Sequence, residues 1–342
     1  MPFTLSTQPY GPLATDTEPL TEYRLEHSET GEFAHIIPGF GAVLRQLVLR
    51  KGNNLLTLVR GPESPQALLA DESYAGAFLY PFPSRIRHGI YRFNDRDYAL
   101  PMNESNRDNA LHGFVHGKPF VVVSQETTDT VARLVLRYSY PGDLAGYPFP
   151  FTLTITYELA QADQLPFGNL PSDHMCALRV SYSALNKGTD ACPAAFGWHP
   201  YFTLSEESID EITLSLPART AIRLDKNMIP IGRSSSQAAE VIALRDQTLD
   251  SAFAIEPTDA AATGESFAET ILTSTKTGVR LVVGQQTGAG KLNFLVCYTP
   301  PRRDSVAIEP LTANVDAFNN GEGLAILNPG DSLNGTTWVR LD

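Results

Sequence analysis

Residues 151–159, with the sequence FTLTITYEL, alternate strictly between apolar or aromatic side chains and polar ones. Side chains that alternate with a period of two point to opposite faces of a β-strand, so this segment is predicted to be a strand with one buried face. The residues expected on the buried face are Phe151, Leu153, Ile155, Tyr157 and Leu159.

Similar segments, rich in β-branched and aromatic residues, recur along the chain and are also predicted to be strands. They are VARLVLRYSY (131–140), ALRVSYSAL (177–185), EITLSLPA (211–218), GVRLVVGQQ (278–286) and KLNFLVCYT (291–299). Turn-forming clusters such as RKGNN, YPGDLAGYP and LNPGDS separate the strands. No window of a dozen residues carries a helical stripe, and SPQALLADE is long enough for two helical turns at most.

Many short strands without a strand–helix–strand rhythm are typical of an all-β sandwich or barrel. We therefore predict an all-β fold with few short helices. Residues 1–342 are expected to form a single domain, in which residues 1–30 are an N-terminal extension or the first strands. The segments GRSSSQAAE (232–240) and EPTDAAATGES (256–266) are predicted to be surface loops.

The composition narrows the classes of function. Hydrophobic residues make up 42% of the chain and charged residues 19%, as in a globular protein with a large core. The formal net charge is −12 without a run of lysine or arginine, which argues against a nucleic-acid partner, because such binding depends on a basic face. No segment resembles a signal peptide or a membrane span, so no membrane partner is expected.

The chain contains three cysteines, Cys176, Cys192 and Cys297, without CxxC spacing. An odd number without this spacing fits neither a disulfide framework nor a zinc site. We expect reduced, mostly buried thiols in a cytoplasmic protein that is a monomer or a weak homodimer.

Two segments offer arginine and histidine side chains. SRIRHG contains Arg85 and Arg87, which are either two solvated arginines or contribute one side chain to a site. NALHGFVHG contains His112 and His116. Two histidines four residues apart would suit a metal only on a helix, and the glycines indicate a loop, so a His–His metal pair is not expected.

Three further ionisable residues lie beside apolar segments. His199, in FGWHPYFTL, is surrounded by aromatic rings and is either a structural histidine or an acid–base group. Asp250, in LDSAFAI, would be costly among its apolar neighbours without a partner. Glu309 follows an apolar run and precedes Pro310, which holds it in an extended conformation. We expect Glu309 to close a strand; a surface or capping glutamate is the alternative.

Seven segments of the chain, taken in order, resemble the aldose 1-epimerase (galactose mutarotase) family, from about residue 30 to the C-terminus. The family's arginine stretch NRI, its LHGG and NHSYFNL boxes, its GYPG turn, its IPTG segment, its glutamate box and its closing L-x-PG turn all have counterparts. The counterparts here are SRIRHG, LHGF, WHPYFTL, AGYPFPF, MIPIG, IEPLTANVDAFN and LNPGDS. The resemblance implies a large antiparallel β-sandwich, often called a supersandwich.

The resemblance also implies roles for individual residues. Glu309 would be the general base and His199 the general acid, while Arg85, His112 and Asp250 would bind the sugar. Trp198 or a neighbouring ring would cover the apolar face of the sugar.

This sequence departs from the family pattern at several positions. Ser84 and Trp198 replace asparagines, Val296 replaces a glutamine, and the glutamate box reads EPL instead of ETQ. Each change removes a hydrogen-bonding group, which puts the family's usual galactose preference in doubt.

The implied reaction interconverts the α and β anomers of a free hexose. A carboxylate and a histidine suit it because one proton is removed from the anomeric hydroxyl and another is given to the ring oxygen. The chemistry involves no redox change or group transfer, so it requires no cofactor and no metal. Two alternatives remain: a hexose-6-phosphate epimerase, using arginines such as Arg87, Arg302 and Arg303, and a non-catalytic sugar-binding module of the same fold.

Overall fold

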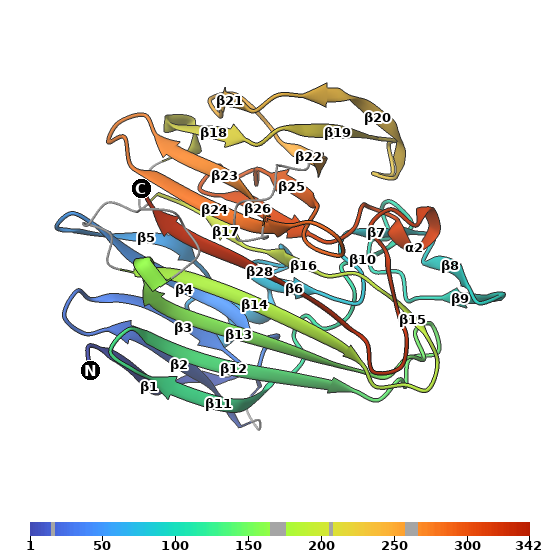
Figure 1. Cartoon of the computed structure of the whole chain (residues 1–342), viewed down its shortest axis with the longest axis horizontal. Helices are drawn as coiled ribbons and strands as arrows, with labels where there is room; N and C mark the ends of the chain where they lie inside the picture. Colours follow the sequence, from blue (N-terminus) through green and yellow to red (C-terminus); the bar gives the residue numbers. More distant parts are fainter. Residues whose placement is uncertain (15–17, 165–175, 205–207, 257–265) are drawn as a thin grey trace.

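The computed structural model describes residues 1–14, 18–164, 176–204, 208–256 and 266–342. These residues form three large antiparallel sheets and three two-stranded ones (Figure 1). Helix in this part of the chain is limited to two short α-helices, α1 (Pro65–Leu69) and α2 (Ala317–Asn320), and two 3₁₀ turns, η1 (Ala162–Gln164) and η2 (Ile209–Glu211). The predicted all-β fold is confirmed.

The strands of the largest sheet lie side by side, from β11 at the bottom of Figure 1 to β21 at the top. Its strands, in spatial order, are β11 (Val121–Thr127), β12 (Val131–Tyr140), β13 (Phe151–Gln161), β14 (Cys176–Asn186), β28 (Ser332–Leu341), β24 (Arg280–Thr287), β23 (Ser266–Ser274), β18 (Ile212–Leu216) and β21 (Glu240–Ala243). The alternation predicted for residues 151–159 is confirmed, because all five apolar residues of that face are buried.

A second large sheet, called here the site sheet, contains the segments that resemble the histidine and glutamate boxes. Its strands, in order, are β20 (Pro230–Gln237), β19 (Arg219–Leu224), β22 (Asp250–Ile255), β25 (Phe294–Tyr298), β26 (Val306–Leu311), β16 (Gly197–His199) and β6 (Ala77–Leu79), with β17 (Tyr201–Phe202) also paired to β26. One face of the site sheet packs on the main hydrophobic core, which also receives side chains from the other two large sheets.

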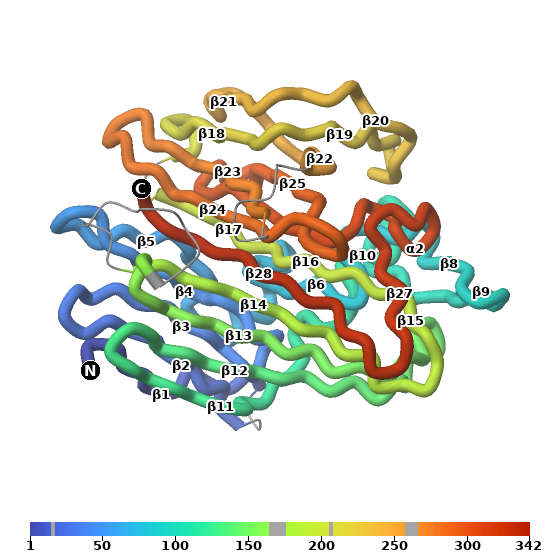
Figure 2. Tube along the Cα trace, in the orientation of Figure 1, coloured from blue at the N-terminus to red at the C-terminus, as the bar shows by residue number. Residues whose placement is uncertain are grey.

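The third large sheet is N-terminal and contains β1 (Phe3–Pro12), β2 (Pro19–His27), β3 (Glu32–Ile37), β4 (Val43–Lys51) and β5 (Asn54–Arg60). The two-stranded sheets pair β7 (Arg85–Arg87) with β10 (Asn109–Leu111), β8 (Ile90–Phe93) with β9 (Arg96–Ala99), and β15 (Cys192–Ala194) with β27 (Ala325–Leu327). Figure 2 shows β7, β8, β10 and α2 gathered at one end of the molecule, although α2 comes more than 200 residues later in the chain.

Two predictions about local structure were wrong. Residues 232–237 belong to strand β20, which pairs with β19, so most of GRSSSQAAE is an edge strand rather than a loop. Glu309 does not close its strand, because β26 continues through Pro310, which lies opposite Leu295. The predicted loop at 256–266 lies almost entirely outside the described residues.

The three cysteines are free and buried, as predicted. No helix in the described residues is long and apolar enough to cross a membrane.

Candidate active site

His199 and Glu309 meet on the face of the site sheet that is turned away from the main core. On β26, Ile308 points into the core, so Glu309 takes the opposite face; β16 presents His199 on that same face. His199 Nε2 lies 3.3 Å from Glu309 Oε1. His199 is 6% exposed and Glu309 is 3% exposed. The contact therefore joins two ionisable groups that are almost fully withdrawn from water.

Burial shifts the proton equilibria of both groups toward their neutral forms. It raises the pKa of Glu309 well above its usual range; the charge of Asp250 adds to this effect, and Arg85 opposes it. Burial also lowers the pKa of His199 to about 4. Both shifts favour the form in which the carboxyl group is protonated and faces an unprotonated imidazole nitrogen, so that the two groups share one proton.

His112 is held beside His199 by a reciprocal pair of hydrogen bonds with Ser84. The main-chain N–H of Ser84 donates to the ring nitrogen Nδ1 of His112 at 3.2 Å, and the main-chain N–H of His112 donates to the Ser84 carbonyl at 2.8 Å. Burial lowers the pKa of His112 well below its usual value, so the ring is neutral. Because Nδ1 accepts a hydrogen bond, the ring proton is assigned to Nε2, which makes that nitrogen a donor.

Backbone conformation explains the glycine after this histidine. His112 has φ of 63° and Gly113 has φ of 67°, so two consecutive residues are left-handed. A Cβ on Gly113 would lie 2.2 Å from the Tyr80 carbonyl oxygen. The His-Gly pair in LHGF therefore reflects a backbone turn that only glycine can complete.

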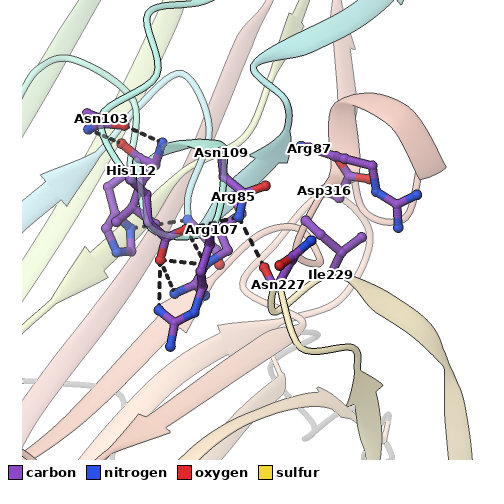
Figure 3. Close-up of polar contacts among 12 residues, drawn as sticks. Arg85, Arg87, Asn103, Arg107, Asn109, His112, Asn227, Ile229 and Asp316 are labelled. Carbon is purple, nitrogen blue, oxygen red and sulfur yellow. Dashed lines mark hydrogen bonds and ion pairs between the residues drawn. The ribbon is translucent and has the colours of Figure 1, made fainter.

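Arg85 is fixed by Glu104, a residue that the sequence did not single out. Its Nε donates to Glu104 Oε2 at 2.9 Å and its Nη2 donates to Oε1 at 2.9 Å. Arg107 and Asn109 donate to the same carboxylate at 2.9 Å each (Figure 3). Burial alone would raise the pKa of Glu104, but hydrogen bonds, first from Arg85 and then from Asn109, hold it below its usual range. Glu104 is therefore an ionised anchor beneath the two arginines.

Asp250 begins β22 on the same face of the site sheet as Glu309. It lies opposite Tyr298 on β25, and Val296, two residues before Tyr298, lies opposite Glu309. Burial raises the pKa of Asp250, whereas the charges of Arg85 and Arg107 lower it. The structure thus brings together the five polar residues predicted for the site: Arg85, His112, His199, Asp250 and Glu309.

The prediction that Trp198 covers a sugar is wrong. Trp198 is 1% exposed and lies one residue before His199 on β16, so its side chain points into the core. Its ring is stacked with that of Phe78, with ring centroids 6.3 Å apart, and contacts the Phe202 ring edge-on. Strand alternation excludes Trp198 from the face that carries His199.

Tyrosines supply the aromatic rings around the site instead. Tyr201 stacks on His199 with ring centroids 5.1 Å apart, and the ring centroids of Tyr74 and His112 are 4.8 Å apart. The Tyr74 hydroxyl accepts a hydrogen bond from Asn103 at 3.0 Å. Tyr201 is two residues after His199, so the period-two rule could have identified it; nothing in the sequence pattern marks Tyr74 or Glu104.

The described residues contain no group of three or more His, Cys, Asp or Glu side chains arranged to hold a metal ion. Two of the three arginines considered for a phosphate, Arg302 and Arg303, are engaged with other residues. Arg303 binds Asp210 and the carbonyls of Leu244 and Gln247, and Arg302 is exposed beside Asp304.

Residues 22–340 match the family model of aldose 1-epimerase. The chain belongs to the aldose 1-epimerase family. This confirms the family identified from the seven sequence segments.

Among curated proteins, this family member is 26% identical to the uncharacterized protein YihR of Escherichia coli K12 over 309 residues, covering 88% of this chain and 87% of that one. It is 25% identical to the galactose mutarotase of Homo sapiens over 178 residues, covering 51% of this chain and 46% of the human protein.

Solved structures share the fold of this aldose 1-epimerase family member. A galactose mutarotase-like protein from Clostridium acetobutylicum superposes with a TM-score of 0.80 at 19% identity, covering 99% of this chain and 98% of that one. A galactose 1-epimerase from Lactobacillus acidophilus gives a TM-score of 0.76 at 18% identity, covering 99% of both chains. The predicted galactose mutarotase-like sandwich is confirmed.

Replacement of the anchoring carboxylate tests how the site is held. Glu104→Ala leaves Arg85 and Arg107 without their shared partner, and breaking a buried ion pair costs about 3–5 kcal/mol. We expect a loss of this size in the free energy of unfolding, measured by urea denaturation. Asp97→Ala, which removes an exposed partner of Arg92, is the matched control and should have little effect. Equal losses in the two variants would contradict the anchoring role.

Proposed function

We propose that this protein is an aldose 1-epimerase that interconverts the α and β anomers of a free hexose by acid/base ring opening and reclosure. The observation that carries the proposal is the buried contact between Glu309 and His199, beside His112, Arg85 and Asp250. Family membership supports the same type of reaction.

In the proposed reaction, Glu309 removes the proton of the anomeric hydroxyl while His199 gives a proton to the ring oxygen. The bond between the anomeric carbon and the ring oxygen breaks, and an open-chain aldehyde forms. Rotation about the bond to the neighbouring carbon presents the other face of the aldehyde, and the reverse proton transfers reclose the ring. Each positioned proton transfer contributes roughly 10²–10⁴-fold in rate.

The pair can reach its reactive form without exchanging protons with solvent. Transfer of the shared proton across the 3.3 Å contact converts a carboxylic acid and an imidazole into a carboxylate and an imidazolium. The guanidinium of Arg85 favours this change, because its charge opposes the raised pKa of Glu309. The carboxylate is then the base and the imidazolium is the acid.

The remaining residues are proposed to orient the sugar. His112 Nε2 donates to a sugar oxygen, and Arg85 and Asp250 bind hydroxyls as charged hydrogen-bonding partners. Tyr74 and Tyr201, whose rings contact His112 and His199, are proposed to contact the C–H groups of the sugar ring, the role first expected of Trp198 or a neighbouring ring.

A free hexose is favoured over a hexose 6-phosphate. Arg303 is occupied by Asp210 and by backbone carbonyls, so it has little capacity left for a phosphate. A non-catalytic binding module would not need a carboxyl and an imidazole buried in contact, since isolating both from water is costly. Polarimetry on freshly dissolved α-anomers, with and without a 6-phosphate, tests all three possibilities directly.

Glu309→Gln keeps the shape of the side chain and removes the base. We expect turnover to fall by roughly 10²–10⁴-fold with little change in sugar affinity. The melting temperature should not fall at pH 7, because burial raises the pKa of Glu309 and an ionised carboxylate there disfavours folding. Polarimetric turnover and a melting curve measure the two effects.

Wild-type turnover in folded Glu309→Gln would remove Glu309 from the mechanism. His199→Asn, which removes the acid, should cost a similar factor. The double variant should lose less than the product of the two single losses, because both residues serve one event.

The pH dependence of turnover follows from the single shared proton. Below the pKa of about 4 for His199 the pair gains a second proton and has no base. Above the raised pKa of Glu309 it loses its only transferable proton and has no acid. We therefore expect kcat/KM to be level between these limits, with an acid limb near pH 4. An acid limb at the ordinary histidine pKa would contradict the burial argument.

Val296 faces the site and occupies the position where the family has a glutamine. We expect this replacement to relax the discrimination between hexose epimers. A missing hydrogen bond no longer penalises the wrong epimer. We expect glucose and galactose to be used with kcat/KM values within about tenfold of each other, and Val296→Gln to widen the ratio. A thousandfold preference in the wild-type protein would show that other residues make the discriminating contacts.

A further inference from the structure

A cavity of about 310 Å³ lies beside the candidate active site. This volume is at the lower end of the roughly 300–1,000 Å³ found for ligand pockets. The cavity is open to solvent on one side and is lined by β7, by residues 229–233 at the start of β20, and by the segment around α2. Its lining residues include Arg87, Ile229, Arg233, Asn314, Asp316 and Glu322.

The hydrogen bond from Asn109 Nδ2 to the Asn227 carbonyl, 3.1 Å long, lies between this cavity and the reacting groups. Figure 3 shows Arg85, Arg107 and His112 on one side of that bond, with Arg87 and Asp316 on the other. The cavity is therefore a neighbouring space with side chains of its own, although Arg85 and Arg87 both belong to β7.

Asp316 provides a buried acceptor at the cavity wall. It is 7% exposed. Its Oδ1 accepts hydrogen bonds from the Arg87 N–H at 3.0 Å and from Asn319 Nδ2 at 2.7 Å. Its Oδ2 accepts from none of the described residues. This oxygen is therefore open to the cavity and able to accept a hydrogen bond from a hydroxyl group of a ligand.

The charges around the cavity indicate the class of ligand. The guanidinium of Arg87 has only a long contact, 3.8 Å, with Asp225, and Arg233 donates to Glu322 at 2.7 Å. The carboxylates of Asp316 and Glu322 disfavour an anionic ligand, and the guanidiniums of Arg87 and Arg233 disfavour a cationic one. A hydroxyl group serves both kinds of partner, because it donates to a carboxylate and accepts from a guanidinium. Pro230, which lines the cavity and is partly exposed, adds an apolar edge that suits the C–H groups of a pyranose ring.

We propose that this cavity is a second saccharide-binding site, which takes a neutral hexose unit next to the reaction site. Arg87 and Asp316 are its central hydrogen-bonding residues. Binding there does not require anomerisation, so the proposal stands or falls independently of the proposed function.

Ile229 gives a direct readout of occupancy. The protein is labelled at isoleucine δ1-methyl groups, the Ile229 signal is assigned with Ile229→Val, and methyl β-D-glucopyranoside, a locked glycoside that cannot open, is titrated. We expect a saturable shift of the Ile229 signal. Arg87→Ala should raise the apparent Kd by roughly tenfold or more, the effect of losing one charged hydrogen bond. Arg92→Ala, at an exposed arginine paired with Asp97, should not change it.

Two further arms separate this site from its alternatives. Asp250→Asn weakens the reaction site but should leave the Ile229 titration unchanged; an equal loss there and in Arg87→Ala would overturn the proposal. An Ile229 response to inorganic phosphate and not to the glycoside would also overturn it, as would no response to either. If Arg87→Ala does not fold, Arg233→Ala, on the exposed side of the β19–β20 hairpin, takes its place with the same expected loss.

Discussion

A strand whose alternate residues are buried in a core must present the other residues on its opposite face, and neighbouring strands of the site sheet obey this constraint together. Ile308, Cys297 and Phe253 face the core, so Glu309, Val296 and Ala252 face away from it. The position of the Glu309 carboxyl group is thus a consequence of core packing. The same constraint places Trp198 inside and His199 outside.

Arg85 and His112 are positioned differently, by hydrogen bonds, because the segments that carry them lie outside the large sheets. Ser84 and His112, which both have a left-handed backbone conformation, are hydrogen-bonded to each other. The Glu104 carboxylate accepts hydrogen bonds from Arg85, Arg107 and Asn109. Since Glu104 is ionised and accepts hydrogen bonds from three side chains, it holds the arginines in place and would not compete for a proton in the proposed reaction. In the proposed reaction, the proton transfers are left to the buried Glu309–His199 pair.

The sequence predicted the strand pattern and the five polar residues because each depended on local rules or on short motifs. Periodicity correctly predicted β12, β13 and β14. Four of the seven segments contain Arg85, His112, His199 and Glu309, and Asp250 follows another of them, MIPIG, in the chain. The prediction for Trp198 was wrong because this residue is adjacent to His199 in the chain, and strand alternation turns its ring into the core. Glu104 was missed because MNESNRDN has no periodicity, and its role arises only when β7 and β10 pair.

The contacts that define the site join residues far apart in the chain. Ser84 and His112 are 28 residues apart, Asn109 and Asn227 are 118 apart, and Arg87 and Asp316 are 229 apart. Closing such loops costs conformational entropy, so we expect these contacts to form late in folding. No short fragment of this chain can therefore reproduce the arrangement of His199, Glu309 and their neighbours, and its presence reports on the folding of almost the entire molecule.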